Sequence, residues 1–427
     1  GTTAGGISIG GSGTSNQVGV MAKGNSNLTV AGTVNISGGD NNIGIYGENS
    51  IITVNGNVAV GNSSFCINKA SSSIGVVLSG GSYTGSGNLS AGNYSIGVFG
   101  KGMAPGSVIT QGTGTETMTV GTEGVGIYGE GTGGTITANM SNITVGTGNA
   151  IGVYAKEMNS VVTGNMGIGA NTSVGIASEG NGNVTYTGAI TIDDKGTGKD
   201  DTASVGIYKK LGSGTITTSG GNWTVGNSGY GIYLKQTAGQ SAIINNNADM
   251  TLGTSSVGIF SNGANTVNNS GNITVGATDV KGDHNKVEDH LNSVGIYGAG
   301  GTKIFNAAGA TIKVHEDHSV GVYVDGSNII TGDKTRFENY GIIDVDNGGV
   351  GVIVRNGAIA VNEGVITLGG NASPICGAVN VGMSASGPGS TIENNGTITI
   401  NSGAGMVVGN QANLINTGTL NVNNGVG

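Results

Sequence analysis

A short apolar phrase with a central glycine recurs along the whole chain and sets its hydrophobic pattern. The form SVGIY occupies 204–208 and 293–297, and close variants occupy 42–46, 95–99, 124–128, 150–154, 229–233, 256–260 and 319–323. The glycines that mark the copies are Gly19, Gly44, Gly75, Gly97, Gly126, Gly152, Gly175, Gly206, Gly231, Gly258, Gly295, Gly321, Gly351, Gly377, Gly405 and Gly427. Their mean spacing of about 27 residues indicates a solenoid, propeller or array.

Each period also contains two further apolar segments, separated by polar turns. After the copy at 256–260 come a turn at 261–265, an apolar piece at 266–267, a second turn, and the segment 272–275. The same order appears at 134–146, 214–226 and 390–400. Short apolar runs bounded by Gly and Asn predict strands, and no helical period is sustained. We therefore predict an all-β, single-chain parallel β-helix of about 15 coils with three short strands of about 3–5 residues per coil, right-handed because parallel crossovers are right-handed.

Alternation along the phrase predicts which side chains face the core. Val205 and Ile207 should share one face, and Gly206 and Tyr208 the other. We expect the Val and Ile column to fill the core, and the glycine column to lie outward or at a bulge beside a corner. Two positions after the marker glycine, most coils carry a ring, namely Tyr46, Phe99, Tyr128, Tyr154, Tyr208, Tyr233, Phe260, Tyr297 and Tyr323. This column is either a stacked aromatic ladder that stiffens the coils or the edge of a glycine groove that stacks against sugars.

Composition and charge agree with a β-rich repeat and exclude several classes of protein. The 427 residues include 88 Gly and 3 Pro but many Val, Ile and Thr, unlike a disordered linker or a collagen. A net charge of −9 offers no basic surface for nucleic acid. No apolar run is long enough for a transmembrane helix. Cys66 and Cys376 would lie many coils apart in a solenoid, so we expect no disulfide between them.

Two insertions and one charged region depart from the uniform coil. The insertions at 193–201 and 277–292 both precede a copy of the phrase, so both should emerge from the same corner. About a quarter of the residues in 279–346 are charged, against 10% in the chain, and all four histidines lie there. The candidate binding residues are Asp193, Asp194, Asp200, Asp201, Asp283, His284, Lys286, Glu288, Asp289, His290 and Asp317.

This charged region has three possible interpretations. It is a solvated loop, a recognition patch for a protein or glycan, or a zinc or other transition-metal site. The candidate metal ligands are His290, His315, Glu316 and His318, which adjacent coils would bring together.

Motifs for catalysis and for calcium binding are missing. The calcium-binding repeat GGxGxD does not occur. Pectin-cleaving β-helices cluster Asp, Arg and Lys on one face, but the only arginines here are Arg336 and Arg355, and the nearest approach to such a cluster is Asp333, Lys334 and Arg336. We expect no enzyme activity, no catalytic residue and no cofactor.

Coils of the form SVGIYG … GxIT … NxGxITVG resemble the passenger regions of type V autotransporter adhesins, and most closely those of the very large fusobacterial outer-membrane adhesins. The resemblance covers 19–427. It implies an extracellular β-helix on the surface of a Gram-negative bacterium, which attaches to host cells or partner bacteria through protein or glycan receptors. It supplies no catalytic motif. The heads of trimeric autotransporters carry a similar phrase, SVAIG, but their period is about half as long, which favours a monomeric rod here.

The family's signal peptide and C-terminal membrane barrel are not found in this sequence. We therefore expect 1–427 to be one continuous passenger segment, which reaches the membrane only through a barrel elsewhere. The segment is either adhesive itself or a passive stalk that presents a distal tip. A β-helix enzyme that acts on polysaccharides is a distant third hypothesis.

Overall fold

The computed structural model describes residues 2–3, 5–10, 15–64, 72–194, 203–237, 239–276, 293–315, 318–327, 332–369 and 379–427. Every regular element in these ranges is a β-strand. The chain divides into two compact units, Gly1–Lys210 (unit 1) and Leu211–Gly427 (unit 2). The single segment 1–427 stays a prediction, and Cys66, Cys376 and Gly377 lie outside the described residues.

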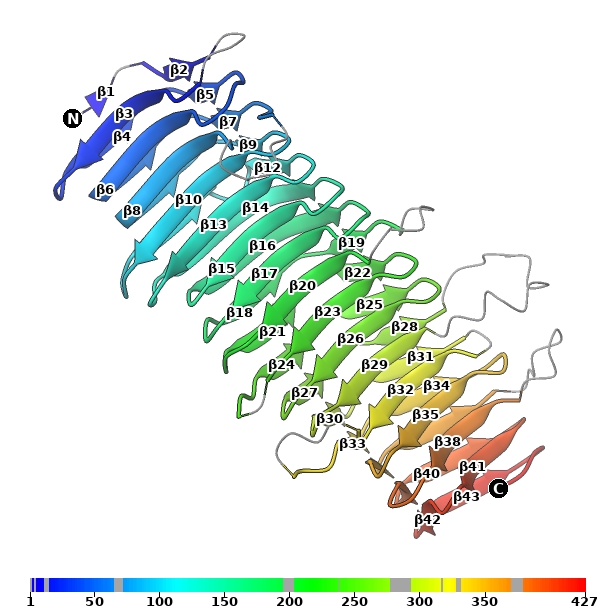
Figure 1. The fold of residues 1–427 in the computed structure, drawn as a ribbon. Helices are drawn as coiled ribbons and strands as arrows, with labels where there is room; N and C mark the ends of the chain where they lie inside the picture. The colour runs from blue at the N-terminus through cyan, green and yellow to red at the C-terminus, as the bar shows by residue number, and fades with distance from the viewer. Residues whose placement is uncertain are drawn as a thin grey trace. The chain divides into compact units, whose positions relative to one another are not determined.

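Unit 1 consists of three columns of parallel strands, one column for each strand of the repeat (Figure 1). The strands that carry the repeated phrase, here called face strands, are β3 (Val18–Lys23), β6 (Ile43–Val54), β8 (Ile74–Gly85), β10 (Ile96–Met103), β13 (Val125–Gly131), β15 (Ile151–Lys156), β17 (Val174–Glu179) and β20 (Val205–Lys210). The second strands are β1 (Thr2–Thr3), β4 (Asn27–Val30), β11 (Val108–Gln111), β14 (Thr135–Val145), β16 (Asn159–Ile168) and β18 (Val184–Thr187). The third strands are β2 (Ile7–Ile9), β5 (Val34–Ile36), β7 (Val58–Val60), β9 (Leu89–Ala91), β12 (Thr117–Val120) and β19 (Ile190–Ile192). The longer strands β6 and β8 run on into the second column, and β14 and β16 into the third.

Unit 2 repeats the same three columns. Its face strands are β23 (Tyr230–Lys235), β26 (Val257–Asn262), β29 (Val294–Ala299), β32 (Val320–Asp325), β35 (Val350–Arg355), β38 (Val381–Ser386) and β41 (Ala404–Gly409). The second strands are β21 (Thr215–Ser219), β24 (Ile243–Asn246), β27 (Thr266–Asn269), β30 (Lys303–Asn306), β33 (Arg336–Asn339), β36 (Ile359–Asn362), β39 (Thr391–Asn394) and β42 (Asn413–Asn416). The third strands are β22 (Asn222–Val225), β25 (Asp249–Leu252), β28 (Ile273–Val275), β31 (Thr311–Val314), β34 (Ile342–Val345), β37 (Val365–Leu368), β40 (Thr397–Ile400) and β43 (Thr419–Val422).

Within each unit, a strand pairs with its equivalent one repeat later. In unit 1, β13 pairs in parallel with β15, so that Tyr128 lies beside Tyr154. In unit 2, β26 pairs in parallel with β29, so that Phe260 lies beside Tyr297. These registers confirm the predicted all-β parallel solenoid with a period of about 27 residues and three strands per coil. The described residues contain fifteen face strands, eight in unit 1 and seven in unit 2. The exact number of coils and the right-handed winding stay predictions.

The core positions of the phrase differ from the alternation that the sequence predicts. In β13 the burial order is half-buried Val125, buried Gly126, buried Ile127 and half-buried Tyr128. Ile127 is fully buried, as are its equivalents Val98 and Val153. The residue before the glycine therefore lies partly on the surface in most coils, and the residue after the glycine forms the core. In β20, Val205 and Ile207 are both buried, as the sequence predicts, but Gly206 is buried with them.

The marker glycine points inward, so the prediction of an outward glycine column is wrong. A Cβ atom on Gly126 would lie 2.6 Å from the carbonyl oxygen of Gly152 and 2.7 Å from Sδ of Met118. The paired register of β13 and β15 passes from Val125 to Ile127 without a partner for Gly126. The strand bends at this point, and the backbone occupies space that a side chain would need.

One marker in the unit 2 column is also misassigned by the sequence. β35 pairs with β38 so that Val350 lies beside Val381 and Val352 beside Met383, which makes Gly382 the partner of Gly351. After Gly382 the phrase has Met383 and Ser384, where most coils have a β-branched residue and a ring, and this is why the apolar pattern favoured Gly377 instead.

Two columns of buried polar side chains connect successive coils. The serine of the SVGIY phrase donates a hydrogen bond to a glycine carbonyl at the preceding corner, as Ser173 does to Gly146 at 2.7 Å and Ser256 to Gly226 at 2.7 Å. In unit 2 six of the eight second strands, β24, β27, β30, β33, β36 and β39, end in a buried asparagine. The Nδ2 of each donates to Oδ1 of the next, at 2.8–2.9 Å, through Asn246, Asn269, Asn306, Asn339, Asn362 and Asn394. Stacked coils thereby satisfy polar groups that one coil alone would leave unpaired.

Candidate functional site

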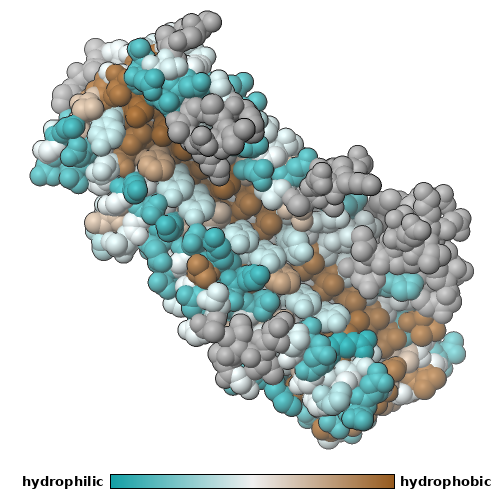
Figure 2. All heavy atoms as spheres, viewed as in Figure 1, coloured by the Kyte–Doolittle hydropathy of each residue, from teal (hydrophilic) through white to brown (hydrophobic). Residues whose placement is uncertain are grey.

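The outward side chains of the face strands form the most ordered array of chemically distinctive groups that the structure describes. Position +2 from the marker glycine carries the rings, and position +4 carries charged residues in most coils of unit 1. In each unit, Figure 2 shows hydrophobic residues over the face strands with hydrophilic residues beside them. We call positions +2 and +4 of the face strands the ring-and-charge face.

The rings of this face stack along each unit. In unit 1, Phe99 and Tyr128 have centroids 4.9 Å apart, and Tyr128 and Tyr154 have centroids 4.8 Å apart with planes at 5°. In unit 2, successive centroid distances are 4.5, 5.0 and 5.4 Å along Tyr233, Phe260, Tyr297 and Tyr323. The spacing follows from the distance of about 4.8 Å between paired strands, which a parallel register imposes on identical positions.

This stacking limits what the rings can bind. Both faces of Tyr128 are covered, by Phe99 on one side and Tyr154 on the other. The glycines lie inside, as Gly126 does, so the rings do not border a glycine groove. Among the described residues around Tyr128, no groove is therefore formed in which sugars stack on ring faces, and this ring presents only its edge and hydroxyl group to the surface.

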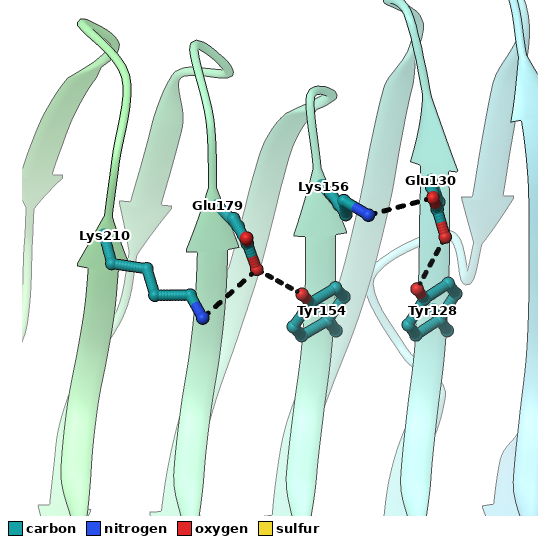
Figure 3. A network of polar contacts seen from close by, with 6 residues as sticks. All are labelled: Tyr128, Glu130, Tyr154, Lys156, Glu179 and Lys210. Carbon is teal, nitrogen blue, oxygen red and sulfur yellow. Dashed lines mark hydrogen bonds and ion pairs between the residues drawn. The ribbon is translucent and has the colours of Figure 1, made fainter.

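The hydroxyl groups of the unit 1 stack are bound to a row of alternating charges (Figure 3). The Tyr128 hydroxyl donates to Oε2 of Glu130 at 2.9 Å, and Nζ of Lys156 lies 3.0 Å from Oε1 of the same carboxylate. One coil further on, the Tyr154 hydroxyl donates to Oε2 of Glu179 at 2.8 Å. Nζ of Lys210 lies 3.4 Å from that same Glu179 oxygen.

The electrostatics of this network keep the two phenols protonated and the Glu130 carboxylate charged. Burial, with the hydrogen bond to Glu130, raises the pKa of Tyr128 to about 12, and burial with the bond to Glu179 also raises the pKa of Tyr154. The hydrogen bond from Lys156 lowers the pKa of Glu130, and the bond from Tyr128 adds to the effect. At neutral pH Tyr128 and Tyr154 are therefore hydrogen-bond donors and Glu130 is an acceptor.

Unit 2 has a looser version of the same arrangement. The Tyr297 hydroxyl lies 3.5 Å from Oδ2 of Asp325, at the limit of a hydrogen bond. Asp325 accepts a 2.7 Å hydrogen bond from Nδ2 of Asn356, and Arg355 is its neighbour in the register. Burial, with the nearby Asp325, raises the pKa of Tyr297 to about 12.

A buried lysine lies just inside this face in unit 1, and the sequence analysis missed it. Lys209 is fully buried, and its Nζ donates to the carbonyl oxygens of Gly180 and Gly182, each at 2.8 Å, and to Oγ of Ser178 at 3.2 Å. Burial lowers the pKa of Lys209 to about 8, and the charge of Glu157 offsets part of that effect. Lys209 lies three residues after the marker glycine, at a position that faces the core, and this spacing could have identified it from the sequence.

Most of the candidate binding residues lie outside the described residues. These are Asp200, Asp201, Asp283, His284, Lys286, Glu288, Asp289, His290 and Asp317, and the proposed metal ligand Glu316 also lies outside them. Asp193 and Asp194 are exposed after β19, and the backbone N–H of Asp193 donates to Ile168 at 2.8 Å. The binding role of both insertions stays a prediction.

Two of the proposed metal ligands can be placed. His315 is half-buried after β31, and its carbonyl oxygen accepts a 3.0 Å hydrogen bond from Asn347. His318 is exposed at the corner before β32, with a left-handed φ of 59° that Ser255 (58°) and Asn149 (59°) share at the equivalent corners. Within the described ranges no group of three or more His, Cys, Asp and Glu residues could hold a metal ion. Since His290 and Glu316 fall outside those ranges, the metal hypothesis stays untested.

Two of the three residues that came nearest to a pectin-cleaving cluster, Asp333 and Arg336, are engaged in local ion pairs. Asp333 lies 3.9 Å from Nζ of Lys303, with both side chains more than half exposed. Nε of Arg336 donates to Oε1 of Glu338 at 2.5 Å along β33. Arg355 lies on a face strand, in a different column from Arg336.

Comparison with known proteins gives one match. Residues 235–378, about a third of the chain and all within unit 2, match the family described as the BigA third pectate lyase-like domain. No curated protein and no solved structure matches the chain significantly. In the part of the chain that the structure describes, no helix has the length and apolar character that crossing a membrane requires.

Proposed function

We propose that this chain is a segment of a bacterial surface adhesin of the autotransporter type. The observation that carries the proposal is the match of 235–378 to a domain of BigA, an autotransporter-type adhesin, on a chain that is a parallel β-solenoid. The repeated VGIY phrase, typical of the very large fusobacterial adhesins, supports the narrower assignment. An extracellular position at the outer membrane of a Gram-negative bacterium is part of the proposal.

The proposed activity is attachment to host cells or to partner bacteria through protein or glycan receptors. A rigid stack of coils is suited to this role because it holds loops in constant positions, and variable loops on a rigid scaffold commonly carry binding. The insertion 277–292 and its charged neighbourhood are the proposed contact region. The inner rings are unsuited to it because their faces are covered, as those of Tyr128 are.

A passive stalk is the second candidate, and a specific observation favours it. The polar groups of the ring-and-charge face that Figure 3 shows are bound to one another, so this part of the face is built to hold coils together.

Enzyme action is a third hypothesis, suggested by the words pectate lyase-like. We propose that the chain has no such activity, because Arg336 and Asp333 are each paired locally with another residue. Release of unsaturated products from polygalacturonate by the purified chain would overturn that view.

The deciding experiment is saturation binding of labelled 1–427 to host cells and to other bacteria. One variant replaces 277–292 with a short Gly-Asn turn, and a second variant replaces 193–201, the other candidate contact loop, in the same way. We expect saturable binding that the first replacement abolishes and the second weakens. Absence of binding by the native chain would instead support the stalk, and binding that survives both replacements would place the contact elsewhere.

A further inference from the structure

Two tyrosines on consecutive coils of unit 1 are held in a geometry that suits a reaction between them. Tyr128 on β13 and Tyr154 on β15 are register partners, with ring centroids 4.8 Å apart and planes at 5°. Both residues are half-buried, so their rings reach the surface at one edge. The parallel ladder holds their backbones together, so the two rings remain neighbours without any cost of bringing them together.

Each of these phenols also has a proton acceptor of its own. The Tyr128 hydroxyl donates to Glu130 at 2.9 Å, and the Tyr154 hydroxyl donates to Glu179 at 2.8 Å. Removing one electron from a phenol makes its hydroxyl strongly acidic, so oxidation proceeds most easily where a base can take the proton at once. Because both phenols stay protonated at neutral pH, that base is needed, and the two carboxylates are placed to serve.

We propose that Tyr128 and Tyr154 form an oxidative coupling site, at which an enzyme of the haem-peroxidase class, using hydrogen peroxide, joins the two rings. Each phenol gives one electron to the oxidant and one proton to its carboxylate. The two phenoxyl radicals then pair to form a carbon–carbon bond between carbons ortho to the hydroxyl groups. The hydrogen on each of those carbons moves to oxygen as the rings regain aromaticity. In sum, two tyrosines lose two electrons and two protons, and one hydrogen peroxide takes them up to form two waters.

The product would be a dityrosine bond between two coils of the same chain. It would join positions 26 residues apart in the sequence but adjacent in the ladder. A covalent link between neighbouring coils restricts the unfolded chain and opposes the separation of β13 from β15, as a disulfide would. The site would therefore convert exposure to peroxide into a tighter solenoid. This role is independent of receptor binding.

Unit 2 provides an internal comparison. Tyr297 and Tyr323 are also register partners, but their centroids are 5.4 Å apart, their planes are at 21°, and the Tyr297 hydroxyl lies 3.5 Å from Asp325. We expect this pair to couple more slowly. Phe260 stacks on both Tyr233 and Tyr297 and, having no hydroxyl, does not couple with either of them.

The test treats dilute 1–427 with a haem peroxidase and hydrogen peroxide, then identifies joined peptides by mass spectrometry and dityrosine by its fluorescence. We expect a peptide pair joined through Tyr128 and Tyr154 with the loss of two hydrogens. Tyr154→Phe should abolish that pair without disturbing the stack, since Phe already occupies this column at Phe99 and Phe260. Tyr46→Phe is the matched control, because its register neighbours are Met21 and Val77 and not rings.

A further variant tests the role of the carboxylate. Glu179→Gln keeps a hydrogen-bond acceptor but removes the base, so coupling should slow severalfold in protein with an unchanged thermal unfolding curve. Oxidation of Tyr340, whose side chain is 47% exposed, shows that the oxidant has acted. If Tyr340 is oxidised while Tyr128 and Tyr154 remain separate, or if the bonds join different molecules only, the proposal is wrong. Equal rates for native and Glu179→Gln protein would overturn the role of the carboxylate.

Discussion

The Tyr154 hydroxyl donates a 2.8 Å hydrogen bond to Oε2 of Glu179, across the boundary between two coils. The same oxygen lies 3.4 Å from Nζ of Lys210 on the next coil, so one carboxylate connects three successive face strands. An array of this kind cannot exist within a single coil. It forms only when residues one period apart become neighbours.

The importance of Glu179 can be measured against that of Lys210. Glu179→Ala removes the acceptor of a partly buried phenol and should lower the free energy of unfolding by about 1–2 kcal/mol. Lys210→Ala removes only an ion pair whose lysine is 43% exposed, and should cost less than about 1 kcal/mol. Urea unfolding of the two variants checks this order. A larger loss for Lys210→Ala would contradict it.

The inward position of Ile259 predicts where truncation destabilises the repeated phrase. Ile259 is fully buried, whereas Val257, which alternation alone assigns to the core, is half-buried. Ile259→Ala should cost about 2–5 kcal/mol because it leaves a cavity among packed side chains, and Val257→Ala should cost clearly less. Chemical unfolding at one temperature gives both values. Equal losses would mean that the two positions are equally buried.

The inward glycine column makes a sharper prediction. Gly126→Ala would place a methyl group 2.6 Å from a backbone oxygen that is held in the ladder, so the strand has to shift. We expect a marked fall in melting temperature, or failure to fold. Gly167→Ala is the matched control, because no atom lies within 4 Å of its added Cβ, and removing a flexible glycine there should leave stability unchanged or slightly raised. The comparison fails if both variants melt alike.

Buried Lys209 predicts a pH dependence of stability. Its pKa is lowered from 10.5 to about 8 in the folded chain, so between these values the unfolded chain binds more protons than the folded one. Below pH 8 the buried amine is charged, and its desolvation lowers the free energy of unfolding. As pH rises from 8 to about 10.5 this penalty disappears, so the free energy of unfolding rises by up to about 3 kcal/mol.

The Lys209 effect is measured as a difference between proteins. Burial raises the pKa of Tyr83 and Tyr186. At high pH these phenols ionise more readily in the unfolded chain, so they lower the free energy of unfolding and oppose the effect of Lys209. The unfolding free energy of Lys209→Met is subtracted from that of the native chain at each pH. The contribution of the tyrosines is the same in both proteins, so it cancels in the difference. We expect the difference to rise between pH 7 and 9.5. A difference that does not change with pH would show that the Lys209 amine is not desolvated in the folded chain.

Sequence alone determined the repeat, the three strands per coil and the neighbours along each column. This was possible because parallel hydrogen bonding brings residues one period apart into contact, so that the spacing from Tyr128 to Tyr154 already encodes their stack. Only the tertiary structure decided the directions of side chains near the bend in the face strand. There the backbone departs from simple alternation, so Gly126 and Ile127 both face the core and Val125 does not. The same side-chain directions determine two further features. They place Glu179 beside Tyr154 and Lys210, and together with the corner after each face strand they bury Lys209. Apolar periodicity carries no information about such a bend, because the bend depends on how closely one backbone packs against the next coil.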